Sequence, residues 1–119
     1  MEFTVSAEDD LLRVRAWGRE TRELPPIGIC QSILDEAKRH GLTRILIELT
    51  HKVALSGVAQ FQIVDRLPSL GLTPLHRIAL VHHTPGLREA SDMIDMAAGN
   101  RGLNVRNFAD IESALAWLA

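Results

Sequence analysis

The sequence predicts an α/β domain in which helices pack on a mixed five-stranded sheet, with the order β-β-α-β-α-β-α-β-α. Three observations lead to this expectation: an N-terminal segment of alternating polar and apolar residues, short apolar runs separated by amphipathic segments, and no linker or internal repeat in 119 residues. Alternation is typical of strands with one buried face, and short apolar runs are typical of strands covered on both faces. Strands that alternate with helices favour parallel crossovers, and the length favours one domain over residues 1–119.

The N-terminal third predicts an antiparallel hairpin and a first helix. Phe3 and Val5 alternate with polar residues, and after residues 7–10 the same alternation returns, with Trp17 on the polar side of the second strand. The apolar positions of this second strand are Leu12, Val14 and Ala16. A proline in the first turn of a helix removes only a donor that would have no partner, so we expect a helix from about Pro26 to His40.

The middle of the chain predicts two buried strands around a helix. Residues 44–49 (RILIEL) and 78–81 (IALV) are short apolar runs bounded by turn residues. Between them an apolar stripe at helical spacing ends near Pro68 and Gly71. The stripe consists of Val58, Phe61, Val64 and Leu67. His82 and His83 follow the second run directly, at the carboxyl end of its strand.

The C-terminal third predicts helix, strand and helix. Thr84–Pro85 favours a helix start, because the threonine hydroxyl can accept from free N–H groups and proline suits the first helical position. This helix is expected to end around residues 99–102, with its apolar inner face at Leu87, Ala90, Ile94 and Ala97 and its solvent side at Asp92 and Asp95. Residues 103–106 form a last strand, and Asp110 is expected to cap a closing helix.

Composition and charge argue against several classes of protein. The chain is 46% hydrophobic and 24% charged, which is typical of globular domains. A net charge of −2 disfavours nucleic acid and anionic membranes as partners, and no apolar run is long enough to span a bilayer. The single cysteine, Cys30, excludes an internal disulfide, and residues 1–10 do not resemble a signal peptide. We therefore expect a soluble protein of the cytoplasm.

A family resemblance rests on residues 107–118 (NFADIESALAWL) and on the segment from Glu48 to Gly57. With these motifs and its order of elements, the chain resembles the SpoIIAA-like small bacterial proteins of the STAS superfamily, which are related to the anti-sigma factor antagonists and to CRAL-TRIO lipid-transfer domains. The resemblance implies a STAS fold and a non-enzymatic module that either regulates by binding or binds a hydrophobic ligand. Most members of this group are uncharacterised.

The resemblance also singles out Ser56–Gly57. In the antagonists a Ser-Gly pair opens the helix after the third strand, and its serine is the phosphorylation switch. A phosphate on Ser56 would meet the positive end of the helix dipole and would repel an acidic partner. The alternative is that Ser56 only caps the helix, as serine often does.

Two binding hypotheses follow. In open α/β sheets, ligands bind outside the carboxyl ends of the strands, where the sequence places Thr50, His51, Ser56, Gly57, His82, His83 and Thr84. The first hypothesis is a protein partner recognised by residues 50–57 and the start of the following helix. The second is a small apolar ligand, such as a fatty acid, held between the sheet and the helices. Met93 and Met96 broaden one apolar helix face, which suits a homodimer surface, an acyl-chain pocket or plain core.

Catalytic and metal sites are less favoured. The spacing of His51, His82 and His83 is not that of a preformed zinc site. His82 and His83 are adjacent on a strand, so their side chains point to opposite faces of the sheet. A hydrolase built from Ser56, His82 or His83, and Asp65 or Asp92 lacks the G-x-S-x-G turn. Glycine-rich phosphate loops are missing, and Cys30 is expected to be a buried structural thiol. The sequence therefore predicts no enzyme, no cofactor and no metal.

Overall fold

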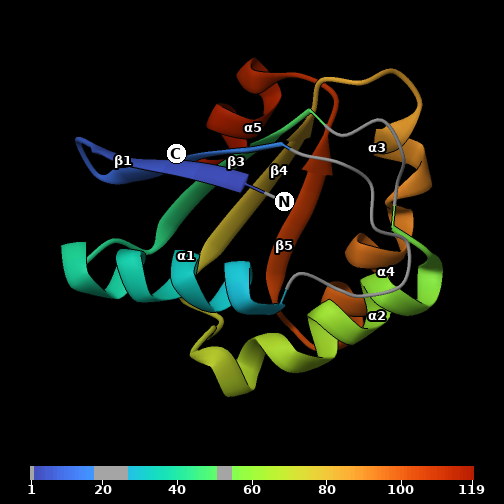
Figure 1. Cartoon of the computed structure of the whole chain (residues 1–119), viewed down its shortest axis with the longest axis horizontal. Coiled ribbons are helices and arrows are strands. Elements are labelled where there is room, and N and C mark those ends of the chain that lie inside the picture. Colours follow the sequence, from blue (N-terminus) through green and yellow to red (C-terminus); the bar gives the residue numbers. More distant parts are fainter. Residues whose placement is uncertain (1, 18–26, 51–54) are drawn as a thin grey trace.

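The computed structural model describes residues 2–17, 27–50 and 55–119, in which the chain forms one five-stranded mixed sheet (Figure 1). Its strands lie side by side in chain order: β1 (Glu2–Glu8), β2 (Leu11–Trp17), β3 (Arg44–Leu49), β4 (Arg77–His82) and β5 (Asn104–Phe108). β1 pairs antiparallel with β2, and all other neighbours are parallel. The predicted α/β class and five-stranded mixed sheet are confirmed, and β3 has the predicted bounds.

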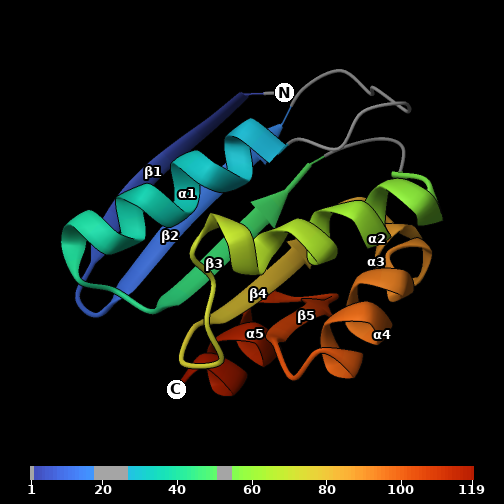
Figure 2. The same cartoon turned by 90° about the horizontal axis from the view of Figure 1, so that it is seen from below.

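Three main helices cover one face of the sheet, and one helix covers the other (Figures 1 and 2). The first group contains α1 (Ile27–His40), α2 (Gly57–Arg66) with the 3₁₀ turn η1 (Leu67–Leu70), and α4 (Asp92–Asn100) after the short α3 (Leu87–Ala90). Each of these connections moves one strand further in the same direction, so right-handed crossovers place their helices on one face. Among the described helices, only α5 (Ile111–Leu118) lies on the opposite face.

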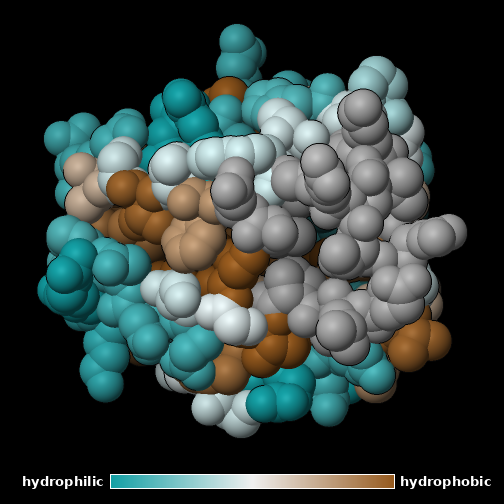
Figure 3. All heavy atoms as spheres, viewed as in Figure 1, coloured by the Kyte–Doolittle hydropathy of each residue, from teal (hydrophilic) through white to brown (hydrophobic). Residues whose placement is uncertain are grey.

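The two faces carry cores of different size. The larger core, under α1, α2 and α4, combines alternate strand residues with the inner sides of the helices, and its most enclosed members are Leu12, Val14, Ala37, Ile45, Val64 and Ala98. The smaller core consists of Leu46, Ala79 and Val81 beneath Ala114 and Leu118 of α5. Figure 3 shows a band of hydrophobic surface in the region where Figure 1 places β1 and α1, two elements that carry the half-buried Phe3, Val5 and Ile29.

The width of the sheet explains where polar residues gather. Strands lie about 4.8 Å apart and a helix with its side chains is about 10 Å wide, so one helix covers only about two or three strands. α5 packs on β3, β4 and β5. On this side of the sheet Arg15 and Trp17 of β2 remain exposed. The α5 side of β2 and the adjoining edge of β3 therefore form a polar face.

Two predicted helix caps are present. Ser56 precedes α2, and its side chain accepts a hydrogen bond from Ala59 N at 3.1 Å. Asp110 precedes α5 and accepts from Ser113 N at 2.7 Å. This bond lowers the pKa of Asp110, as expected for a carboxylate that satisfies a free N–H group.

The predicted third helix is wrong in its start and in its continuity. The residue before α3 is Gly86, with a φ of 84°, a left-handed conformation that glycine adopts without strain, so Thr84–Pro85 does not begin the helix. The helical segment is interrupted at Ser91, which is buried. Because of this break Ala90 is exposed, while Asp95, expected on the solvent side, turns toward the sheet and accepts from Asn107 N at 2.8 Å.

Smaller boundary errors concern the ends of other elements. The last strand begins and ends later than expected, at Asn104 and Phe108, and β4 is one residue longer at each end than the predicted 78–81. By contrast, the expected stop near Pro68 and Gly71 is confirmed, because η1 ends at Leu70 and Gly71 caps it. The expected helix start at Pro26 lies outside the described residues, and α1 is described from Ile27 onward.

Candidate functional site

The carboxyl ends of β2, β3 and β4 meet at one edge of the sheet. Two backbone hydrogen bonds extend the strand pairing there, from Thr50 N to Ala16 O at 3.2 Å and from His83 N to Leu49 O at 3.0 Å. Strand side chains alternate between faces, so every second residue at this edge lies on the α5 side. Those residues are Arg15 and Trp17 of β2, Glu48 of β3, Thr50 directly after β3, and His83 after β4.

Glu48 is the centre of this group. Its side chain is 8% exposed, although it carries a charge and lies between apolar residues of β3. Its Oε2 atom accepts from Arg13 Nε at 2.8 Å and forms an ion pair with Arg15 Nε at 3.5 Å. Its Oε1 atom lies 3.1 Å from His83 Nε2. A carboxylate only accepts hydrogen bonds, so the Nε2 atom of His83 carries the proton in this contact.

Hydrogen bonds and nearby positive charges, rather than water, stabilise the ionised form of Glu48. Burial by itself raises the pKa of this carboxyl group, but hydrogen bonds from Arg13 and His83 and the charges of Arg13 and Arg15 outweigh burial and lower the pKa from 4.5. The hydrogen bond to Glu48 in turn raises the pKa of Arg13. Glu48 is therefore ionised at neutral pH, and its cluster is a fixed ionic group at the sheet edge.

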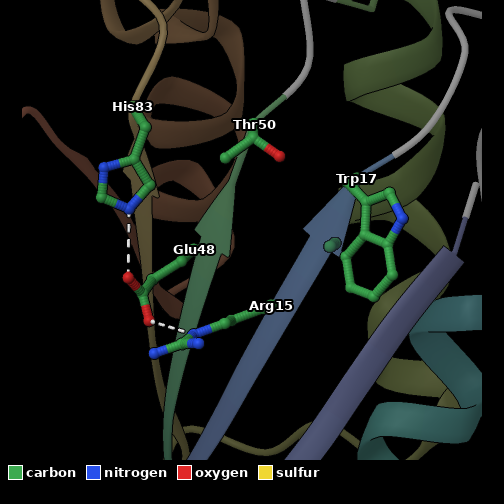
Figure 4. A pocket seen from close by; sticks show the side chains of 6 residues that line it. Arg15, Trp17, Glu48, Thr50 and His83 are labelled. Carbon is green, nitrogen blue, oxygen red and sulfur yellow. Dashed lines mark hydrogen bonds and ion pairs between the residues drawn. The ribbon is translucent and has the colours of Figure 1, made fainter.

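A pocket of about 260 Å³ opens beside this cluster (Figure 4). It is lined by Arg15, Ala16, Trp17, Glu48, Thr50 and His83. In Figure 4 the Trp17 ring stands on one side of the pocket, Glu48 and His83 on the other, and Thr50 between them at the end of β3. Arg15 extends toward Glu48 from the neighbouring strand. The pocket thus combines an aromatic ring, an exposed guanidinium group and a neutralised carboxylate.

His82 lies on the other face, buried beneath α4. Its Nε2 atom is 2.6 Å from Asn107 Oδ1. The amide nitrogen of Asn107 donates to Ser91 O at 2.9 Å and to Asp95 Oδ1 at 3.0 Å, so its oxygen accepts from His82. Burial lowers the pKa of His82, against the opposing effect of the Asn107 hydrogen bond. His82 therefore belongs to a buried polar network that joins β4, β5 and α4.

A second exposed surface lies around the start of α2, where α2 packs against α4. Its apolar side chains belong to Val58, Phe61, Met93 and Met96, which we call the α2–α4 surface; Val58 is 69% and Met96 60% exposed. A side chain at Gly57 would meet Met93 Cε at 3.9 Å, so the Ser56–Gly57 pair and α4 are adjacent.

The predicted site residues therefore do not form one group. Thr50 and His83 line the pocket on the α5 side, while His82 is buried on the other face. Ser56 and Gly57 adjoin the α2–α4 surface, to which Met93 and Met96 belong. Thr84 follows His83 and is half-buried. His51 lies outside the described residues, as do residues 52–54 of the expected recognition loop.

Among the described residues, those weighed for metal, hydrolase and thiol chemistry have other contacts. Within the described residues, no three histidine, cysteine or carboxylate side chains lie close enough to hold a metal ion. Ser56 Oγ is engaged with Ala59 N in the helix cap, and His83 is engaged with Glu48. Cys30 is half-buried against the larger core, and burial raises the pKa of its thiol to about 11, which keeps it protonated and unreactive at neutral pH.

Sequence reasoning missed Arg13, Arg15 and Glu48 as members of a site. One signal was present: Glu48 is the single acidic residue within the apolar run 44–49, and a charge is almost never fully buried unless it is paired. The identity of its partners was not readable, because Arg13 lies 35 residues away and meets Glu48 only through the register of β2 and β3.

Comparisons with known proteins give no relative for this chain: no family model, no curated protein and no solved structure matches it. Among the described helices, none combines the length and the apolar character needed to cross a bilayer.

Proposed function

We propose that this chain is a non-enzymatic binding or regulatory module of the STAS type, which recognises a protein partner through the start of α2 and the adjoining α2–α4 surface. One observation carries the proposal: four large apolar side chains are exposed on two helices that pack against each other. Single exposed apolar residues are common, but groups of them more often mark an interaction surface. Methionine supports this reading because its flexible side chain adapts to irregular partners.

Ser56 fits the same proposal as a regulatory residue. It is exposed, caps α2 and precedes the glycine that lies beside Met93. A phosphate on its hydroxyl would add about −1.5 to −2 charges at the border of the α2–α4 surface and at the N-terminus of a helix. Phosphorylation would therefore leave α2 in place and weaken the binding of an apolar or acidic partner.

The test is a photo-crosslinking residue placed at Val58 in cells of the source organism. Leu75 provides the matched control, because it is apolar and 81% exposed but lies in the turn before β4. We expect a discrete crosslinked protein from position 58 and not from position 75. A Met96→Asp change in the same chain should abolish the crosslink, since it places a charge in the surface. Equal crosslinking from both positions, or a crosslink that persists with Met96→Asp, would contradict the proposal.

The second hypothesis, an apolar ligand held between the sheet and the helices, predicts a different result. Native mass spectrometry of the purified chain would then show an adduct with the mass of a lipid. Placing the charge on the exposed Met96 would not remove that adduct, because its side chain points away from the core. The two experiments together separate a surface that binds protein from an interior that binds a lipid.

A further inference from the structure

The pocket on the α5 side of the sheet is separate from the α2–α4 surface. At about 260 Å³ it is slightly smaller than the range of about 300–1,000 Å³ that is usual for drug-sized ligands. Its walls come from three strand ends, which are rigid elements, and not from a single loop. The geometry therefore suits a ligand with one ring and one polar group.

The charged side chains of the pocket offer hydrogen-bond donors rather than acceptors to a ligand. Both carboxylate oxygens of Glu48 already have partners, Oε1 with His83 and Oε2 with Arg13 and Arg15. The Glu48 side chain is also 8% exposed, so a cationic ligand would have to displace one of these groups to reach it. Glu48 thus positions the neighbouring cations and is not itself a contact for a ligand.

Arg15 supplies the donors. Its side chain is 67% exposed, and the one ion pair that it forms within the described residues is the 3.5 Å contact from Nε to Glu48. A guanidinium group has five N–H donors in a planar fork, so the Nη groups remain to bind a carboxylate with two parallel hydrogen bonds. The shorter 2.8 Å bond from Arg13 neutralises Glu48, which leaves the charge of Arg15 to attract an anion.

Trp17 supplies the apolar wall. Its indole ring stands across the pocket from Glu48 and His83, with the hydroxyl group of Thr50 between them (Figure 4). Aromatic rings pack well on an indole face in offset or tilted arrangements. A monoanion fits better than a dianion, because Arg13 already pairs with Glu48 and Arg15 contributes a single positive charge to the pocket.

We propose that this pocket binds a small aromatic carboxylate, with the carboxylate on the Nη groups of Arg15 and the ring against Trp17. The probes are benzoate and two molecules of nearly the same shape, neutral benzamide and cationic benzylammonium. The readout is the indole N–H signal of Trp17 in nitrogen-edited NMR spectra, assigned with Trp17→Phe. The chain has two tryptophans, and Trp117, which packs against Phe108, is an internal reference.

We expect benzoate to shift the Trp17 signal in a saturable way and the Trp117 signal much less. Hydrogen bonds to a charged group contribute enough that benzamide should bind about tenfold more weakly. Arg15→Gln should reduce benzoate affinity to that of benzamide. Arg39→Gln, at an exposed arginine of α1 that pairs with Glu36, should leave benzoate affinity unchanged.

Three results would overturn this proposal: no saturable shift with benzoate, binding of benzylammonium or benzamide as tight as that of benzoate, or unchanged benzoate affinity in Arg15→Gln. Arg15 is exposed and its one ion pair is long, so the variant should keep its fold, which the dispersion of its spectrum checks. The crosslinking experiment at Val58 concerns a different surface, so failure of either proposal leaves the other standing.

Discussion

The two arginines beside Glu48 should contribute unequally to the stability of the fold. Arg13 Nε lies 2.8 Å from the carboxylate and its side chain is 26% exposed, whereas Arg15 Nε lies 3.5 Å away with 67% exposure. A hydrogen bond to a charged group contributes about 1.5–3 kcal/mol, while exposed ion pairs contribute about 0–1 kcal/mol. Arg13 therefore accounts for most of the stabilisation that Glu48 gains from the two arginines.

The perturbation is Glu48→Gln, which keeps the shape of the side chain and one acceptor but removes the charge. We expect it to lower the free energy of unfolding by about 2 kcal/mol, because the bond from Arg13 loses its ionic character and an amide N–H group must face a donor. With a urea dependence of about 2 kcal/mol per molar, the unfolding midpoint should fall by about 1 M. Urea titrations followed by circular dichroism measure this shift.

Double-mutant cycles then assign the effect to a partner. Combining Glu48→Gln with Arg13→Gln should give a coupling free energy of about 1.5 kcal/mol or more, and combining it with Arg15→Gln about 0.5 kcal/mol or less. An Arg15 coupling as large as that of Arg13 would refute the reasoning from distance and exposure. An increase in the stability of Glu48→Gln would refute it as well. The free-energy cost of burying the charge would then exceed the stabilisation that its partners provide.

Two further predictions concern the helix side of the sheet. Ser56→Ala should lower the free energy of unfolding by about 1 kcal/mol because α2 loses its cap, whereas Ser56→Asp, which can still accept from Ala59 N, should cost much less; thermal unfolding of both variants checks this. Burial lowers the pKa of His82 from 6.5, so as the pH falls below 6.5 the unfolded chain takes up a proton before the folded chain does, and stability decreases. In His82→Gln the decrease in the free energy of unfolding between pH 7 and the pKa of His82 in the folded chain should be smaller. Urea titrations at several pH values measure this, and an unchanged pH dependence would disprove the assignment to His82.

Much of the fold could be predicted because local patterns and the tertiary structure agree. The apolar run 44–49 is a buried strand with its predicted bounds, and Ser56 and Asp110 are the residues that cap α2 and α5. The helix between β4 and β5 could not be predicted in the same way. Its break at Ser91 accompanies a contact with Asn107, sixteen residues further along the chain, and no local pattern encodes that partner.

The sequence predicted which end of the sheet carries the candidate site residues. It did not predict which face of the sheet each of them occupies. Residues at the carboxyl ends of parallel strands share an edge, which the order of strands and helices already implies. Which face each one occupies depends on the pleat, and a shift of one residue sends a side chain to the opposite face. His82 and His83 differ by one residue, and one is buried with Asn107 under α4 while the other reaches Glu48 on the α5 side.

The uneven cover of the sheet explains why the second face holds the pocket. Three crossover connections place their helices on one face, so that face becomes a closed core, and α5 is the one described helix on the other. The strands that α5 does not cover would expose apolar residues unless polar ones replaced them, and β2 accordingly carries Arg13 and Arg15 on that side. The arginines stabilise Glu48, and the one that lies farther from it and is more exposed keeps donors for a ligand. The same arrangement that makes β2 compatible with solvent thus leaves an arginine beside an aromatic ring, at the edge where parallel sheets bind their ligands.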